Sequence, residues 1–175
     1  MSASRHEIES VDYERIVVPL DGSGLAERAL PHAETLARAT RAPIHLLRVV
    51  DIAPLTQLSA VGPGAEPAAV FAELEIVTTE EEAAEDYLEM LRRRMVEQGL
   101  AATVEVRTGL VKAELLAAAQ PRDLVVMTTH GRTGLERLFF GSVAEAMIRR
   151  SIAPVLLVRS NLAPVEVAET SEVTV

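Results

Sequence analysis

The chain has 175 residues, of which 49% are hydrophobic and 25% charged, a balance typical of one globular domain. It contains no cysteine, which excludes disulfides, thiolate metal sites and a thiol nucleophile, and which fits a reducing, cytoplasmic compartment. The formal charge of −9 argues against nucleic-acid binding, and no apolar run approaches the roughly 20 residues that cross a bilayer, so no membrane partner is expected.

Five short apolar segments alternate with helical patterns along the chain. Strands are predicted over residues 15–20, 43–50, 103–107, 123–128 and 154–158. Helices are predicted over 25–40, 73–98, 111–119 and 142–150, and the Gly- and Pro-rich stretch 51–67 predicts a long loop. Because the strands lack period-2 alternation, we expect a parallel sheet that is buried between helices on both faces.

In such a sheet a ligand binds beyond the carboxyl ends of the strands, where the strand order reverses. This rule selects the loops after the first and fourth predicted strands. In the first loop, Asp21 is the leading candidate for a ligand contact, and an Asx-turn with Gly22 and Ser23 is the alternative. Ser23 itself is expected to cap the following helix.

The second loop, MTTHGRTGLERLFFGSV at 127–143, combines three glycines with two predicted helix starts. Thr133 with Glu136 and Ser142 with Glu145 have the spacing of capping boxes. Helix starts offer unpaired N–H groups to an anion, and glycines let the backbone approach it. Arg132 either adds positive charge there or lies in solvent. The alternative interpretation is a tight connection with ordinary caps.

These residues resemble the universal stress proteins that bind ATP. That family carries Gly-x-x-Gly, nine residues, then Gly-Ser or Gly-Thr, and this sequence has Gly131, nine residues and Gly141-Ser142. The first glycine of the pattern falls on Thr128, which places a β-carbon and a hydroxyl where the backbone approaches ribose or the first phosphates. The segments VVPLDGS, HLLRVVD and SIAPVLLVR resemble the first, second and closing strands of the family, so the resemblance covers about residues 14–159.

The resemblance implies a single Rossmann-like (adenine-nucleotide alpha-hydrolase-like) α/β domain over 14–159, between a polar leader 1–13 and an acidic tail 160–175 that is either disordered or an edge strand. The implied sheet is five-stranded and parallel, in the order 3-2-1-4-5, with helices on both faces. The implied ligand is ATP, or AMP or ADP, with Mg²⁺ or Mn²⁺ bound through the phosphates. The residues assigned to the nucleotide are Pro19, Leu20, Asp21, Val49, Met127, Thr128, Gly131, Arg132, Gly141, Ser142 and Val143.

The leading hypothesis for function is an ATP-binding module of stress response or signalling that acts as a homodimer. The apolar strand predicted at 154–158 would be a sheet edge, which a second copy can cover symmetrically. A slow ATPase is the second hypothesis, although the single lysine, Lys112, is far from the Gly-rich segment and no catalytic residues are expected. Thr128 motivates the third, a nucleotide-free dimeric interaction protein.

Overall fold

The protein is described from a computed structural model, which covers residues 12–53, 67–129 and 141–159. Its centre is a five-stranded parallel sheet, and the strand order β3-β2-β1-β4-β5 is the one that the family resemblance implies. The strands are β1 (Arg15–Leu20), β2 (Ile44–Asp51), β3 (Ala102–Gly109), β4 (Asp123–Thr129) and β5 (Val155–Arg159).

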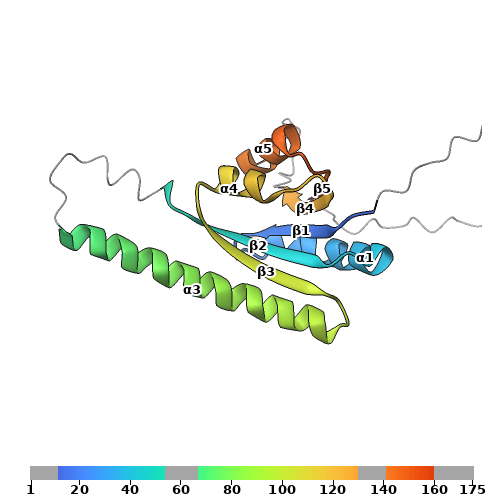
Figure 1. Ribbon diagram of the computed structural model, residues 1–175, viewed down its shortest axis with the longest axis horizontal. Helices are drawn as coiled ribbons and strands as arrows, with labels where there is room; N and C mark the ends of the chain where they lie inside the picture. The colour runs from blue at the N-terminus through green and yellow to red at the C-terminus, as the bar shows by residue number, and fades with distance from the viewer. Residues whose placement is uncertain (1–11, 54–66, 130–140, 160–175) are drawn as a thin grey trace, which may run out of the picture.

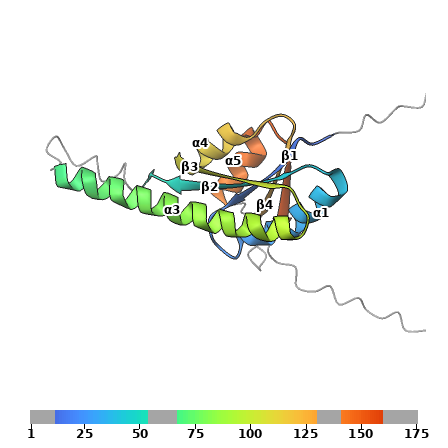
Figure 2. The same cartoon turned by 60° about the horizontal axis from the view of Figure 1, so that its bottom comes forward.

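Helices cover both faces of the sheet, which confirms the predicted three-layer α/β fold (Figure 1). On one face lie the short 3₁₀ helix η1 (Ala26–Ala29), α1 (Leu30–Thr40) and α3 (Pro67–Glu97). On the other face lie α4 (Val111–Ala118) and α5 (Ser142–Arg150). The turned view in Figure 2 shows α3 running along the sheet on the side opposite to α4 and α5.

Two apolar cores fill the space between the sheet and its helices. Alternate residues of each strand enter different cores, because successive side chains of a strand point to opposite faces. In β1, Ile16 and Val18 pack with α1 and α3, whereas Val17 packs with α4 and α5. All three are buried, which explains why the strands read as continuous apolar runs rather than as alternating ones.

Several predicted boundaries differ by one or two residues, and three differences stand out, two of which involve proline. Helix α3 begins at Pro67 instead of residue 73, because proline is tolerated in the first helical turn, where its missing N–H would be unpaired. The predicted helix over 25–40 is divided into η1 and α1, since Pro31 stands in the first turn of α1 and cannot donate to the turn before it. Strand β2 continues to Asp51, so the predicted loop 51–67 is shorter at both ends.

A charged pair joins β1 and β4 at their amino ends. Arg15 donates from Nε to Asp123 Oδ1 at 2.9 Å and from Nη2 to Asp123 Oδ2 at 2.8 Å. The carboxylate is buried, and its Oδ2 also accepts the backbone N–H of Gln120 at 2.8 Å. The pair therefore fixes the register of the two central strands whose opposite ends carry the predicted site.

Candidate functional site at the carboxyl ends of β1 and β4

The strand order reverses between β1 and β4, because β2 and β3 follow on one side of β1 and β5 follows on the far side of β4. The backbone pairing is uneven at this point. The register between β1 and β2 continues to the end of β1, at Leu20↔Arg48. The register between β1 and β4 stops at Val17↔Val125.

Pro19 explains why the pairing of β1 with β4 stops early. Ile16 donates its N–H to the carbonyl of Pro43, next to β2, so the N–H groups of alternate residues in β1 point toward β2. Positions 17 and 19 then face β4, and Pro19 has no N–H to continue the ladder. The carboxyl ends of the two strands are therefore joined less tightly than their amino ends, at the place where ligands bind in this class of sheet.

Asp21 forms the turn that follows β1. Its Oδ1 accepts the backbone N–H of Ser23 at 2.9 Å, which is the Asx-turn that the sequence left as an alternative. The Ser23 hydroxyl accepts the N–H of Ala26, the first residue of η1, at 3.1 Å, although the N-cap residue of that helix is Leu25. Gly22 has a φ of +83°, a conformation that favours glycine. The Asp21 carboxylate is exposed and thus accessible to a ligand while one of its oxygens holds the turn.

The environment of Asp21 favours its ionised form. Partial burial raises the pKa of the carboxyl. Hydrogen bonds from Ser23 and the positive charge of Arg48 lower it, and together their effect is larger than that of burial. The net pKa of Asp21 therefore lies below its ordinary value. An ionised carboxylate at this point can accept hydrogen bonds from ribose hydroxyls or from a base, and it opposes phosphate unless a cation lies between them.

Helix α5 begins with Gly141 as its N-cap and Ser142 as its first helical residue. The predicted capping box of Ser142 with Glu145 is therefore wrong by one position, since a glycine cap has no side chain that could accept a hydrogen bond. Glu145 instead donates its backbone N–H to the Gly141 carbonyl at 2.9 Å and pairs through its carboxylate with Arg149. The N–H groups of residues 142–144 have no acceptor within the helix, and they form a group of donors at its positive end.

The predicted site residues divide between the two faces of the sheet. Val49, Met127 and Val143 belong to the core on the α4 and α5 side. Leu20 belongs to the core on the α1 and α3 side, and Thr128 follows Leu124 and Val126 onto that same side by strand alternation. Gly131, Arg132 and the predicted capping pair Thr133 and Glu136 lie outside the described residues.

A polar cluster around the buried His45 joins β2 and β3, and the sequence did not predict it. His45 Nδ1 lies 2.9 Å from Thr103 Oγ1, and His45 Nε2 lies 2.7 Å from Glu105 Oε2. The other oxygen of Glu105 accepts from Arg107 Nε at 2.6 Å. These partners are about 60 residues from His45 in sequence, and the parallel register of β2 with β3 alone brings them together. The cluster lies toward the amino end of β2, away from the candidate site.

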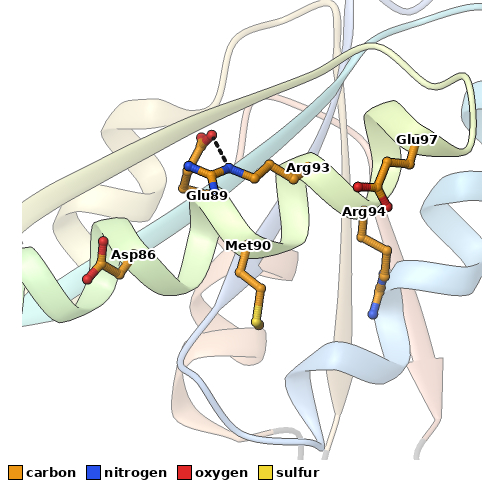
Figure 3. Close-up of a pocket in the computed structure, with 6 residues that line it drawn as sticks. All are labelled: Asp86, Glu89, Met90, Arg93, Arg94 and Glu97. Carbon is orange, nitrogen blue, oxygen red and sulfur yellow. Dashed lines mark hydrogen bonds and ion pairs between the residues drawn. The ribbon is translucent and has the colours of Figure 1, made fainter.

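A shallow hollow of about 400 Å³ lies on α3 (Figure 3). All six lining side chains come from this one helix: Met90 and five charged residues, Asp86, Glu89, Arg93, Arg94 and Glu97. Glu89 pairs with Arg92 and Arg93, which lowers the pKa of its carboxyl to about 2. The hollow holds no residue of the candidate site.

Among residues 12–53, 67–129 and 141–159, no three histidine, aspartate or glutamate side chains are grouped so that they could hold a metal ion. In the same ranges, no helix combines the length and apolar composition that a membrane span requires.

Comparison with known proteins identifies the family. The model of the universal stress protein family matches residues 12–159. Universal stress protein MJ0531 of Methanocaldococcus jannaschii is 34% identical over 149 residues, which is 84% of this chain and 82% of that protein. The chain belongs to the universal stress protein family.

Two further members show how closely the family likeness extends to structure. Universal stress protein MJ0577 of the same organism is 28% identical over 86% of this chain and 97% of its own length. Its solved structure matches with a TM-score of 0.69, at 26% identity, over 87% of this chain and all of that one. A universal stress protein solved in complex with cAMP matches with a TM-score of 0.50 over 86% of this chain and 99% of that one, and its 21% identity supports the shared fold alone.

Proposed function

We propose that this universal stress protein binds an adenine nucleotide at the carboxyl ends of β1 and β4, with ATP as the leading candidate. The observation that supports the proposal is the early end of the β1–β4 ladder. The last paired residues are Val17 and Val125, and β1 continues unpaired with β4 from there to the Asp21 turn. Asp21 stands on one side of this point and the N-terminal N–H groups of α5 follow β4 on the other. A nucleotide placed across it meets a carboxylate at its nucleoside end and helix donors at its phosphates.

The apolar contacts of the nucleotide base would come from three residues that already share one core. Val49, Met127 and Val143 come from β2, β4 and α5, and Val49 and Val143 are half-buried at its border. A base that packs against them would extend this core by its flat apolar face. The phosphates would carry Mg²⁺ or Mn²⁺, which offsets their charge beside the Asp21 carboxylate in a protein of formal charge −9. Gly131 and Arg132 are proposed to complete the phosphate contacts.

Isothermal titration calorimetry with ATP and Mg²⁺ tests the proposal. We expect saturable heat with ATP and weaker heat with GTP; AMP, ADP and cAMP are titrated to rank the adenine nucleotides. The double variant Gly131→Val with Gly141→Val should abolish the heat, because bulk then fills the space that the phosphates need, while thermal unfolding shows whether the fold is retained. Heat indistinguishable from buffer dilution in the wild type would favour the nucleotide-free interaction protein instead.

We further propose that the protein acts in the cytoplasm as a homodimer through β5, with nucleotide occupancy altering the dimer or its partners. In the described part of the chain, β5 is an edge strand, and its exposed face is apolar, with Leu156 38% and the neighbouring Ile152 64% exposed. The opposite edge strand β3 carries Glu105 and Arg107, charges of the kind that keep sheet edges apart. Pairing of β5 with the same strand of a second copy would cover the apolar edge symmetrically.

The dimer is tested by light scattering at micromolar concentration. We expect the wild type to have the mass of two chains and Leu156→Lys to have the mass of one, because a charge would then be buried at the centre of the interface. Leu110→Lys is the matched control, since Leu110 is equally apolar and 53% exposed but lies at the start of α4. A monomeric wild type, or equal masses for both variants, would contradict the β5 interface.

A further inference from the structure

The half-buried side chain of Arg48 lies next to the turn formed by Asp21, Gly22 and Ser23. Its guanidinium is close to the backbone of Gly22: a β-carbon placed on Gly22 would stand 3.4 Å from Arg48 Nη1 and 3.6 Å from Cζ. A β-carbon at these distances would make ordinary van der Waals contact, so the guanidinium lies beside the turn with no side chain between them. The positive φ favours glycine at position 22, whereas a β-carbon there would make only ordinary contacts with Arg48.

On its other side, Arg48 contacts α3. Its Cζ lies 5.5 Å from the centre of the Tyr87 ring, within the range of a cation–π contact. The Tyr87 hydroxyl donates to Glu27 Oε1 in η1 at 2.9 Å. Burial and the adjacent Glu27 carboxylate both raise the pKa of Tyr87, so the hydroxyl remains a neutral donor. The Arg48 cluster, defined as Gly22, Glu27, Arg48 and Tyr87, thus joins the loop after β1 to β2, η1 and α3.

The contacts of Arg48 are unusual for an arginine. Among the residues that the structure describes, the Arg48 guanidinium has no hydrogen-bond or ion-pair partner, whereas the guanidinium groups of Arg15, Arg92 and Arg107 each bind a carboxylate at short distance. Its guanidinium instead lies between the turn and the Tyr87 ring. Its charge still acts on the turn, since it favours the ionised form of Asp21. The planar guanidinium suits this role better than the flexible ammonium of lysine.

We infer that Arg48, supported by the Tyr87 ring, is a positioning residue for the nucleotide site: it holds the Asp21 turn in the geometry that binds the nucleotide and so couples α3 to that site. This inference rests on the proposed function for its effect on affinity, but the positioning itself is a property of the nucleotide-free protein. It can therefore be measured whether or not a nucleotide binds.

The test compares Arg48→Met and Tyr87→Leu with Tyr87→Phe, which keeps the ring and removes only the hydroxyl. Arg93→Met is the matched control for the loss of one charge, because Arg93 is 72% exposed on α3. The first readout, without nucleotide, is the solvent-exchange rate of the Ser23 amide by NMR, since that amide bonds to Asp21 Oδ1. We expect exchange about fivefold faster in Arg48→Met and Tyr87→Leu, the size that one cation–π contact supports, and unchanged exchange in Tyr87→Phe and Arg93→Met.

The second readout is ATP affinity, which we expect to fall by a similar factor of about five in Arg48→Met and Tyr87→Leu only. If the wild type binds no nucleotide, the proposed function fails, and the Ser23 exchange rates still decide the positioning role. Unchanged Ser23 exchange in a folded Arg48→Met variant would overturn the inference. So would equal effects of Tyr87→Phe and Tyr87→Leu, because the hydrogen bond to Glu27 rather than the stacked ring would then hold the turn.

Discussion

Replacing Asp123 by asparagine tests how the two central strands are held together. The carboxylate is 1% exposed, binds Arg15 through both oxygens at 2.9 and 2.8 Å, and accepts the Gln120 N–H at 2.8 Å. Asparagine keeps the volume but removes the charge and turns one acceptor into a donor that faces the Arg15 guanidinium. Breaking a buried pair in this way leaves the partner's charge uncompensated, and we expect a loss of about 3–5 kcal/mol in the free energy of unfolding.

Urea unfolding of the nucleotide-free protein measures this loss. At about 2–4 °C per kcal/mol for a domain of this size, the melting temperature should also fall by about 6–20 °C. The matched control is Glu14→Gln, because Glu14 pairs with Arg122 at 2.7 Å near the same strand ends but both side chains are more than half exposed. An exposed pair contributes at most about 1 kcal/mol. A loss below about 1 kcal/mol for Asp123→Asn, or equal losses for both variants, would refute the reasoning.

Three further predictions concern the site and the pH dependence of stability. Thr128→Gly, followed by calorimetry with ATP, should tighten binding if the β-carbon obstructs the ligand and weaken it if the hydroxyl is a ligand group; unchanged affinity would place Thr128 outside the site. Pro19→Val restores an N–H that faces β4, so it should raise the urea midpoint and weaken ATP binding by closing the strand ends together; a lower midpoint would contradict our account of the ladder. Burial raises the pKa of Glu105, but hydrogen bonds with Arg107 and His45 lower it by more, so the net pKa lies below the ordinary value. Its contribution to stability is thus complete above the unfolded-state pKa of about 4.3 and is lost as the pH falls through the folded-state pKa, so the wild type should lose urea stability below about pH 4.3 more steeply than Glu105→Gln; parallel curves would contradict this.

The sheet could be predicted from the sequence because its strands are buried on both faces. Apolar runs such as residues 15–20 and 123–128 need no partner to be recognised, and their alternation with helical patterns indicates parallel pairing. The strand order came from the family resemblance rather than from the runs themselves. Helix ends were predicted less well: Pro67 reads as a loop residue although it begins α3, and Gly141 rather than Ser142 caps α5.

Contacts across strands could not be predicted in the same way. His45 is recognisable as the middle of an apolar strand, but its partners Thr103 and Glu105 depend on the register of β2 with β3. Arg48 likewise lies between Gly22 and the Tyr87 ring, which belong to different parts of the chain. No local sequence pattern predicts this arrangement. The sequence does carry one signal of the site. A proline within a central strand, here Pro19, marks a place where a ladder is interrupted.

The most direct test of the nucleotide site is an NMR titration of the labelled protein with ATP and Mg²⁺. Signals of Asp21, Val49 and Thr128 and of the α5 amides at 142–144 should shift together and saturate, because the proposed ligand lies between these residues. Amides at the amino ends of the strands, such as those of Ile44 and Ala102, should not move. An absence of shifts, or shifts confined to the hollow on α3 at Asp86 to Glu97, would contradict the site.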